Sequence, residues 1–431
     1  MKYFFLPLFL IIFSTQSRSQ VNIQIGKSNE IVYPVTPNET NNHSELISLE
    51  KLFTGKKIVG MGEATHGTKE FFNMKTKMFK FLVKHSGYKI FTIEAPFGGT
   101  LKVNDYILYG KGDVLSAMKG LQHGAWYTEE VRDLIEWMRL YNNDKPDNDK
   151  LKFYGFDCQS FKGPNNALSD YIKDYDNENI AEFLNGSSIL NDSSLSYFYY
   201  QRNRSSAKKV ILIVQEIIAF QEKWFRERQD FYISRSGREK YNLAVHNIEN
   251  IKQASLLISY SQNNLQYLRD SCMAQNIKWI YEYENSKVFI WAHNGHVCIG
   301  ATTHIHNWYK PKRMGGFLKD MFGKDYYNIG FAFNEGKLGI GKISDTGGIK
   351  EYNFPVYKKN TLTNSLSLSG SDAFFIDLIT SDNPVFSTLQ RTYNVGAGFI
   401  NYKRCSDKLI PKEQFDGLIY INKTTRAIAI L

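Results

Sequence analysis

Acidic residues and histidines follow four short apolar runs of the sequence, and each run begins after a lysine. With their first polar residues, the runs cover positions 57–63, 89–94, 152–157 and 287–293. Continuously apolar runs of this length are typical of strands buried on both faces of a parallel sheet. Ligands of such a sheet bind beyond the carboxyl ends of its strands. The pattern therefore predicts that the polar residues after the runs meet in one site.

Three histidines and two glutamates are the candidate catalytic residues of that site: His66, Glu63, Glu94, His293 and His296. Taken singly, each suits an ordinary structural role, such as a helix cap, a turn residue or a hydrogen-bonded buried histidine. Gathered in one pocket, they would cost several kcal/mol per unpaired ion, and a function would explain that cost. The joint occurrence therefore indicates a functional site.

Two kinds of chemistry fit these residues. A histidine with an ordinary pKa of about 6.5 accepts a proton from water at neutral pH, and a nearby carboxylate fixes its tautomer. Glu63 and His66, three residues apart, supply such a pair. The same histidines and glutamates are also suitable ligands for a divalent metal that would activate the water instead. The residues leave both mechanisms open.

Several common motifs are absent from the sequence. No G-x-S-x-G elbow marks a serine nucleophile, and no Walker or G-x-G-x-x-G loop follows a strand. The chain carries 53 Lys and Arg against 43 Asp and Glu, a formal charge of +10, but its basic residues are scattered. This distribution predicts no nucleic-acid partner. Four cysteines without C-x-x-C spacing predict buried thiols, two of which an exported chain would be able to pair.

Residues 1–19 have the pattern of a secretory signal peptide. Lys2 precedes an apolar run over residues 3–13, and a polar stretch containing Ser17 and Ser19 follows. The apolar run is shorter than the roughly 20 residues of a membrane-spanning helix, and no nearby Cys offers a lipid anchor. We therefore expect an exported protein, periplasmic or secreted, without a stable membrane anchor. After the signal peptide, residues 20–45 are expected to form an irregular leader.

Helical patterns alternate with the apolar runs. Apolar residues recur at helical spacing over residues 69–85 and 129–141. Long helical patterns then replace the strands over residues 164–286, which indicates a helical insertion before the last histidine motif. Alternation of strands and helices is typical of an α/β fold.

Strand-like runs return after the insertion, around residues 328–333, 373–378 and 417–421. We therefore predict an α/β fold with a mostly parallel sheet flanked by helices. Its first part is expected at residues 46–163 and its second part at residues 287–431, on either side of the insertion.

Several separate motifs of the chain resemble those of the erythromycin esterase family, whose members hydrolyse the lactone ring of macrolide antibiotics. The matching segments are residues 62–67 with 70–72, 93–94, 126–131, 155–157, 269–276, 292–296 and 415–419. They are spread over most of the chain that follows the signal peptide. The resemblance implies ester hydrolysis without a metal, in which His66 acts as the general base on water. It also implies that Glu63, Glu94, His293 and His296 surround this base.

The family also has a basic residue on the helix after the first motif. Its resistance enzymes have arginine there, whereas this chain has Lys75, which lacks the bidentate fork of a guanidinium. We expect Lys75 or His293 to stabilise the oxyanion that forms during ester hydrolysis. The residues expected to bind substrate are His123, Trp126, Asp157 and Arg269.

Three functional hypotheses follow. The first is an exported carboxylic-ester hydrolase that needs no cofactor, acts on a small-molecule ester and opens a macrolide lactone, which would confer antibiotic resistance. The second is a metal-dependent hydrolase of another ester, an amide or a polysaccharide acyl group. The third is a module that binds haem or another cofactor without turnover. The sequence gives no prediction of the oligomeric state.

Overall fold

The computed structural model describes most of the chain. The described residues are 20–38, 40–192, 204–259, 262–300, 312–342, 349–356, 361–396, 398–399, 401–402 and 405–430. The predicted signal peptide, residues 1–19, lies outside them. Among the described residues, no helix is long and apolar enough to cross a bilayer.

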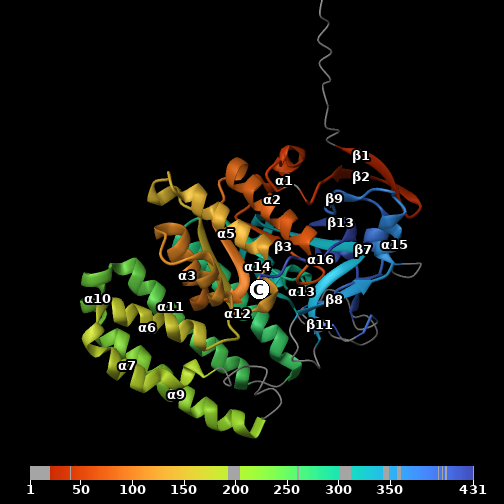
Figure 1. The fold of residues 1–431 in the computed structure, drawn as a ribbon. Coiled ribbons are helices and arrows are strands. Elements are labelled where there is room, and N and C mark those ends of the chain that lie inside the picture. The colour runs from red at the N-terminus through yellow and green to blue at the C-terminus, as the bar shows by residue number, and fades with distance from the viewer. Residues whose placement is uncertain are drawn as a thin grey trace, which may run out of the picture.

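One large mixed sheet forms the centre of the molecule (Figure 1). The strands are β1 (Val21–Ile25), β2 (Ser28–Pro34), β3 (Ile58–Met61), β4 (Ile90–Pro96), β5 (Lys152–Asp157), β6 (Val288–Trp291), β7 (Tyr326–Lys342), β8 (Ile349–Phe354), β9 (Ala373–Asp377), β10 (Gln390–Tyr393), β11 (Gly398–Phe399), β12 (Ser406–Leu409) and β13 (Gly417–Thr424). The main path runs in the order β1, β2, β9, β13, β7, β3, β6, β4 and β5. Strands β10 and β12 pair separately as a small antiparallel sheet.

The functional half of the large sheet is parallel. Strands β13, β7, β3, β6, β4 and β5 are neighbours in this order, and every pair among them is parallel. The four apolar runs of the sequence coincide with β3, β4, β5 and β6, which confirms the prediction that they are buried parallel strands. Strand β6 lies between β3 and β4, so all four carboxyl ends share one edge.

Helices cover both faces of this sheet. They are α1 (Glu50–Phe53), α2 (Lys69–Ser86), α3 (Phe97–Tyr109), α4 (Val114–Met118), α5 (Glu129–Asn142), α6 (Lys162–Tyr175), α7 (Ile180–Ser187), α9 (Arg204–Glu227), α10 (Gln229–Ser236), α11 (Arg238–Ser259), α12 (Gln262–Glu284), α13 (Asn294–Val297), α14 (Met314–Phe322), α15 (Leu362–Ser367) and α16 (Pro411–Gln414). One apolar core packs α2 and α5 on the sheet, and a second core packs α12 and α14 on it. The predicted α/β fold with a mostly parallel, helix-flanked sheet is therefore confirmed.

The segment between β5 and β6 is mostly helical where the structure describes it. Helices α6, α7, α9, α10 and α11 share an apolar core of their own and lie together beyond the β5 edge of the sheet (Figure 1). Helix α12 then returns to the sheet, where Met273, Ile277 and Ile280 join the core under β6. This segment is the helical insertion expected before the last histidine motif. The proposed domain boundaries at residues 46, 164 and 287 stay a prediction.

The expectation of an irregular leader at residues 20–45 is wrong for its first part. Residues 21–34 form an antiparallel hairpin of β1 and β2, and β2 also pairs with β9. Apolar Val21, Ile23 and Ile25 alternate with polar residues, and Gly26 adopts a positive φ of 62° in the two-residue turn. Alternating apolar and polar residues on both sides of a two-residue turn are typical of a β-hairpin. The hairpin extends the sheet at the edge far from β5.

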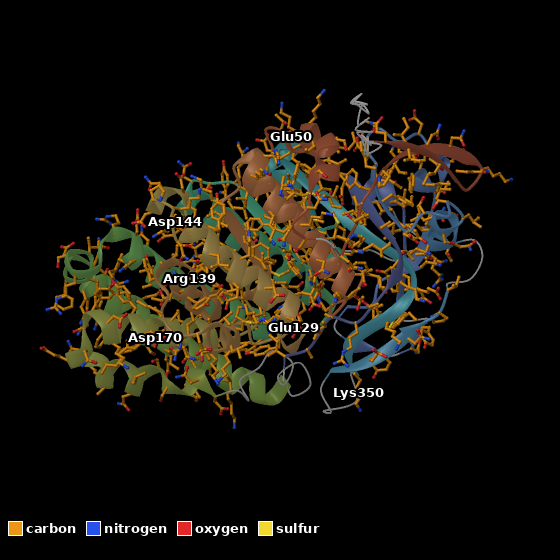
Figure 2. All side chains as sticks on the ribbon, turned by 45° about the horizontal axis from the view of Figure 1, so that its top comes forward. Glu50, Glu129, Arg139, Asp144, Asp170 and Lys350 are labelled. Carbon is orange, nitrogen blue, oxygen red and sulfur yellow. The ribbon has the colours of Figure 1, made fainter. Side chains whose placement is uncertain are left out.

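Charged side chains of both signs are mixed on the outer surface. The charged residues labelled in Figure 2 project outward from the ribbon: Glu50, Glu129, Arg139, Asp144, Asp170 and Lys350.

Candidate active site

The first half of the site lies in the loop after β3. Glu63 is completely buried, and its Oε1 makes a short hydrogen bond with Nδ1 of His66. Gly67 closes the loop with a φ of +76°, and a side chain there would meet the carbonyl of Gly339 at 2.0 Å. A glycine at this turn therefore lets the loop lie against β7 and hold His66 in place. Among the described residues, Nε2 of His66 has no hydrogen-bond partner.

Two buried donors hold the other oxygen of Glu63. The ammonium of Lys75 donates to Oε2 at 2.5 Å, and the indole N–H of Trp291 donates to the same oxygen at 3.1 Å. Lys75 also donates to the carbonyl of Ala292 at 3.2 Å and lies over the ring of Trp291. Burial lowers the pKa of Lys75 to about 8, although Glu63 opposes this shift. The lysine thus balances the carboxylate charge behind His66.

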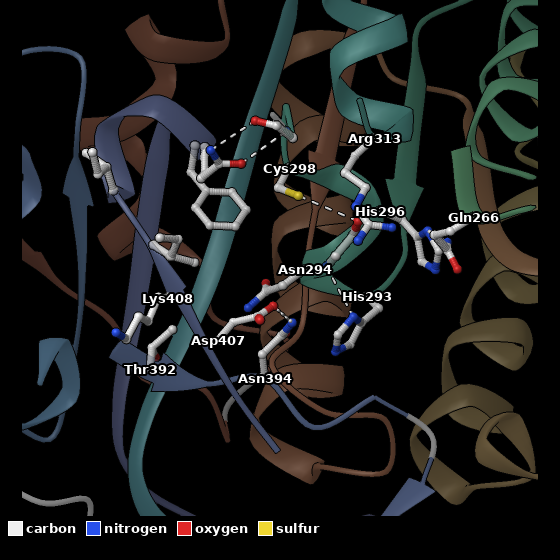
Figure 3. Close-up of a pocket in the computed structure, with 16 residues that line it drawn as sticks. Gln266, His293, Asn294, His296, Cys298, Arg313, Thr392, Asn394, Asp407 and Lys408 are labelled. Carbon is white, nitrogen blue, oxygen red and sulfur yellow. Dashed lines mark hydrogen bonds between the residues drawn. The ribbon is translucent and has the colours of Figure 1, made fainter. Parts of the chain in front are cut away.

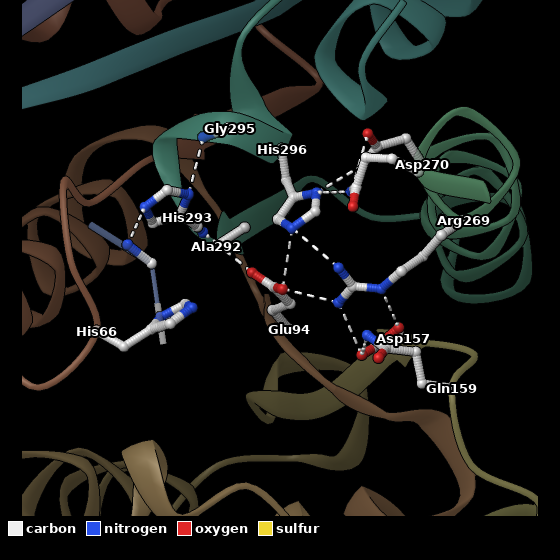
Figure 4. Close-up of polar contacts among 12 residues, drawn as sticks. His66, Glu94, Asp157, Gln159, Arg269, Asp270, Ala292, His293, Gly295 and His296 are labelled. Atoms are coloured by element: carbon white, nitrogen blue, oxygen red, sulfur yellow. Dashed lines mark hydrogen bonds and ion pairs between the residues drawn. The ribbon is translucent and has the colours of Figure 1, made fainter. Parts of the chain in front are cut away.

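Glu94 is the centre of the second half of the site, at the end of β4 (Figure 4). Its Oε1 accepts from Arg269 at 2.8 Å and lies 3.1 Å from Nε2 of His296, while its Oε2 accepts the backbone N–H of His293 at 3.1 Å. Burial alone would raise the pKa of Glu94, but His296 and Arg269 hold it well below its usual range. Glu94 is therefore ionised at neutral pH.

Arg269 joins the helical insertion to the ends of two strands. Its guanidinium binds Asp157 through two hydrogen bonds of 3.0 and 2.9 Å and reaches Glu94 with the same Nη2. Planar bidentate geometry of this kind is the strong form of an arginine–carboxylate pair. The side chain of Asp157 is fully buried, and this ion pair fixes α12 against the carboxyl ends of β4 and β5.

His296 has a carboxylate at each ring nitrogen. Nδ1 lies 2.5 Å from Asp270, and Nε2 lies 3.1 Å from Glu94. Burial by itself would lower the pKa of His296, but Glu94 and Asp270 raise it to about 9. His296 therefore carries a positive charge at neutral pH and leaves neither nitrogen free to act as a base.

His293 is the neutral histidine of the group. Burial, followed by the nearby His66 and His296, keeps its pKa well below its usual range. Its Nδ1 accepts the N–H of Gly295 at 3.1 Å, and its Nε2 lies 3.1 Å from the N–H of Gly396. Backbone groups thus occupy both nitrogens. The ring of His293 lies 5.3 Å from that of His66, between the two halves of the site.

Exposure separates the residues that reach solvent from those that support them. His66, Glu94, His293 and His296 keep between 6% and 8% of their surface exposed, whereas Glu63 is fully enclosed. A water molecule or substrate therefore contacts the three histidines and Glu94. The unpartnered Nε2 of His66 is the basic atom among these that is free to accept a proton.

The geometry corrects two of the expected roles. Lys75 has no exposed surface and lies behind Glu63, and both nitrogens of His293 face backbone N–H groups. Lys75 is therefore not placed to contact an oxyanion directly, whereas the expected role of His293, which is 8% exposed, stays a prediction. Asp157 is buried in its ion pair and Trp126 is 1% exposed, so neither binds substrate directly as expected. Trp126 instead packs against His66 and donates to the carbonyl of Glu94 at 3.0 Å.

The two remaining residues expected to bind substrate lie at the margin of the site. His123 is 39% exposed in its side chain and lies 3.7 Å from Asp157. Arg269 is 8% exposed, and its Nη1 lies 3.0 Å from Nε2 of His296. Both positions are compatible with contact to a bound molecule, and their role in substrate binding stays a prediction.

Sequence reasoning missed several residues that complete the site. Asp270 bonds His296, Trp291 bonds Glu63, and Gly396 contacts both His66 and His293 through its backbone. Asp270 follows Arg269 directly, and Trp291 ends the strand before His293, so their positions were available as a signal. Gly396 contributes only backbone atoms, and the sequence gives no signal for such a contact because every residue has these atoms.

The end of the described chain fastens the His66 loop to the Trp126 loop. Residues 425–430 bridge to Thr68 on one side and to Thr128 on the other. Two buried carboxylates reinforce this strap: Glu70 accepts from the backbone and hydroxyl of Thr425 at 2.7 and 2.6 Å, and Glu130 accepts from the N–H of Ile428 at 3.2 Å. We call residues 425–430 the C-terminal strap. It fixes the loop that carries His66 and the loop that carries Trp126 relative to each other.

The cysteines and the possible metal ligands bear on the sequence predictions. Three of the four cysteines are buried, as expected, and Cys298 is partly exposed. Within the described ranges, no three His, Cys, Asp or Glu side chains form a group that is arranged to hold a metal ion.

A histidine held by a buried carboxylate at the carboxyl edge of a parallel sheet is suited to activating water for hydrolysis. The comparisons with known proteins agree with this class. The chain belongs to the erythromycin esterase family, since the family model described as erythromycin esterase matches residues 83–424. This result confirms the resemblance seen in the motifs and makes the protein a hydrolase of that family.

Two curated relatives align with nearly the whole chain. YbfO of Bacillus subtilis (strain 168), which is named as a hydrolase, is 26% identical over 412 residues, covering 90% of this chain and 88% of YbfO. An erythromycin esterase type II of Escherichia coli is 24% identical over 416 residues, covering 89% of this chain and 94% of that protein.

Solved structures share the fold. A Bacillus cereus protein superposes with a TM-score of 0.76 at 24% identity, covering 93% of this chain and 97% of its own. A protein titled as a succinoglycan biosynthesis protein gives 0.77 at 24% identity, with 93% and 96% covered. An erythromycin esterase mutant in its open conformation gives 0.65 at 15% identity, with 90% and 96% covered. These likenesses establish the fold and carry no assignment of substrate.

Proposed function

We propose that the protein is an exported carboxylic-ester hydrolase in which His66 activates water without a metal, and that it opens macrolide lactones and so confers resistance to them. One observation carries the proposal: His66 is bonded at Nδ1 by the buried Glu63 and has no partner at Nε2 among the described residues. An imidazole held in this way is ready to accept a proton at one nitrogen only.

The reaction follows from these contacts. Nε2 of His66 takes a proton from water as the water oxygen attacks the ester carbonyl, and Glu63 stabilises the imidazolium that forms. The carbonyl oxygen becomes an oxyanion, and we assign its stabilisation to the cationic His296 and Arg269, each of which is 8% exposed. The tetrahedral intermediate then expels the alkoxide, which takes the proton back from His66. The products are a carboxylic acid and an alcohol, or the opened hydroxy acid of a lactone.

The supporting residues make this charge distribution stable. Lys75 and Trp291 hold Glu63 from behind, so the carboxylate that faces His66 keeps a fixed orientation. Asp157 and Glu94 neutralise Arg269, and Asp270 neutralises His296. The site therefore presents a base on one side and, on the other, two cationic side chains whose charges are balanced by buried carboxylates.

A panel of esters tests the proposal. The purified mature protein is incubated with erythromycin, related macrolides and simple acetate esters, with and without a chelator, and mass spectrometry follows the gain of one water. We expect a chelator-resistant gain of water that a folded His66→Ala protein makes roughly 10² to 10⁴ times more slowly. Equal rates in wild type and His66→Ala would overturn the assignment of the base.

The same preparation decides the alternatives. A metal-dependent hydrolase would lose activity with the chelator and regain it with one divalent metal per chain. A haem-binding module would show a visible absorption band and no turnover. For export, the mature N-terminus of the protein recovered from the periplasm or the medium would begin near residue 20, after removal of residues 1–19.

A further inference from the structure

A cavity with both polar and apolar lining residues opens beside two histidines of the site. It has a volume of about 210 Å³, and His293 and His296 form part of its wall (Figure 3). The rest of the wall comes from elements that the reaction described above does not use, including Gln266, Arg313, Thr392 and Asn394. His66 does not line this cavity, but His293 does and its ring lies 5.3 Å from that of His66, so the cavity adjoins the base.

Two polar atoms in the cavity wall lack partners. The hydroxyl of Thr392 and the amide oxygen of Asn394 are enclosed and have no hydrogen-bond partner among the described residues. Thr392 is only 4% exposed. Buried polar groups are nearly always hydrogen-bonded, so orphaned atoms in a cavity wall call for a partner that enters the cavity.

The amide of Asn394 has a fixed orientation. Its Nδ2 donates to the carboxylate of Asp407 at 3.0 Å, so Oδ1 is the end that is left without a partner. Thr392 pairs with Asp407 across the small sheet of β10 and β12, which brings both orphaned atoms to the same wall. This wall offers a fixed acceptor beside a hydroxyl that can donate or accept.

The same stretch of chain connects this wall to the base. Beyond Asn394, the N–H of Val395 donates to the carbonyl of Ala64 at 2.6 Å, and Gly396 bridges to Thr65 and contacts the backbone of His66. Gly396 follows Thr392 by four positions in the chain, a span of at most about 14 Å. The cavity therefore has a fixed position relative to the base.

We propose that this cavity is a substrate subsite that binds a hydroxyl-rich group, such as a sugar or polyol unit, attached next to the ester. The inference rests on the proposed function and specifies the chemistry of its substrate. A substrate hydroxyl donates to Oδ1 of Asn394, and a second hydroxyl exchanges a hydrogen bond with Thr392. Both orphaned atoms are then satisfied when the substrate is bound.

Other groups fit this wall less well. A carboxylate or phosphate has no proton to donate, so it would face the lone pairs of the Asn394 oxygen without a hydrogen bond. An alkyl chain would remove both polar atoms from water and pair neither of them. A hydroxylated group should therefore be preferred to an isosteric hydrocarbon by roughly 10-fold or more.

Two acetate esters with the same acyl group test the proposal: methyl 6-O-acetyl-β-glucopyranoside and cyclohexylmethyl acetate. They differ chiefly in their ring hydroxyls, so the ratio of their kcat/KM values reports the subsite. We expect wild type to prefer the glucoside by roughly 10-fold or more, and Thr392→Val to bring this ratio close to one. A ratio near one in wild type, or an unchanged ratio in Thr392→Val, would overturn the subsite.

Thr76→Val is the matched control. Thr76 is also buried, at 5% exposure, and its hydroxyl also lacks a partner, but it does not line the cavity. Both valine variants remove one orphaned hydroxyl and keep the shape of the side chain, so both should fold with an unchanged or slightly higher Tm. The ester ratio should change only in Thr392→Val.

A binding measurement keeps the subsite testable if neither ester is hydrolysed, which would count against the proposed function on these substrates. Saturation-transfer NMR is recorded with methyl β-glucopyranoside on the folded His66→Ala protein and on the same protein with Thr392→Val added. Contact seen in the first and lost in the second supports the subsite. Absence of contact in the first, or equal contact in both, overturns it.

Discussion

The site has two halves that use the same residue types in opposite ways. In the first half, Glu63 bonds one nitrogen of His66, and a buried lysine balances its charge. In the second half, two carboxylates bond both nitrogens of His296 and raise its pKa to about 9. One carboxylate on a histidine therefore leaves a base, whereas two carboxylates make a cation at neutral pH.

This difference shows that pairing of a histidine with an acid does not define its role. The role of the histidine depends on how many of its ring nitrogens are free and on which group neutralises the acid. Lys75 supplies that neutralisation at Glu63 from inside the core, whereas Arg269 does so at Glu94 from the helical insertion. The two halves meet at the neutral His293, whose ring lies against His66.

The largest losses of stability and activity are expected when Glu63 is replaced in the first half of the site. Glu63→Gln leaves the ammonium of Lys75 buried without its carboxylate, which should lower the free energy of unfolding by about 3–5 kcal/mol. The same change removes the partner of His66 and should lower kcat roughly 10² to 10⁴-fold. Urea unfolding and ester hydrolysis measure the two losses.

A double variant separates these losses. Glu63→Gln combined with Lys75→Met removes both charges, so most of the stability should return while kcat stays low. Recovery of activity together with stability would show that Glu63 serves only the fold.

The second half is expected to produce a dependence of stability on pH. Because the folded-state pKa of His296 is about 9 and lies above its unfolded value of about 6.5, the charged form stabilises the fold fully below pH 6.5. That contribution, roughly 3 kcal/mol, is lost as pH rises through about 9. The difference in unfolding free energy between wild type and His296→Gln should therefore shrink between pH 6.5 and 9. A difference that stays constant with pH would contradict the charged state of His296.

A smaller effect is expected at the C-terminal strap. Glu70→Gln weakens the two bonds to Thr425, which should cost about 1–2 kcal/mol of stability and lower kcat roughly 3- to 10-fold by loosening the His66 loop. Glu136→Gln is the control, because Glu136 bonds Tyr106 on the far side of α5 and does not touch the strap. If the two variants have the same kcat, the strap does not position the base.

Much of the fold and the grouping of the candidate site residues were predictable from the sequence. The four apolar runs identified β3, β4, β5 and β6, because strands buried on both faces require apolar residues throughout. The helix expected over residues 69–85 ends one residue later in the structure, at Ser86. The rule that ligands bind at carboxyl ends then brought Glu63, Glu94 and the histidines together.

What the sequence did not predict depends on contacts between distant backbone segments. Gly396 and the C-terminal strap act through N–H and C=O groups that every residue has, so residue types give no signal. The burial of Lys75 was also hidden, because a lysine on a helix is usually exposed. The hairpin of β1 and β2 was predictable, since its alternation and its two-residue turn are visible in residues 21–34.

Chemical rescue tests the central claim, that His66 is the base, most directly. His66→Gly removes the imidazole and leaves room beside Glu63, so added imidazole should restore ester hydrolysis in proportion to its unprotonated fraction. The rescue should be unaffected by a chelator, and Glu63→Gln should not respond to imidazole. Hydrolysis by His66→Gly at the wild-type rate without imidazole, or restoration by a divalent metal in place of imidazole, would contradict the claim.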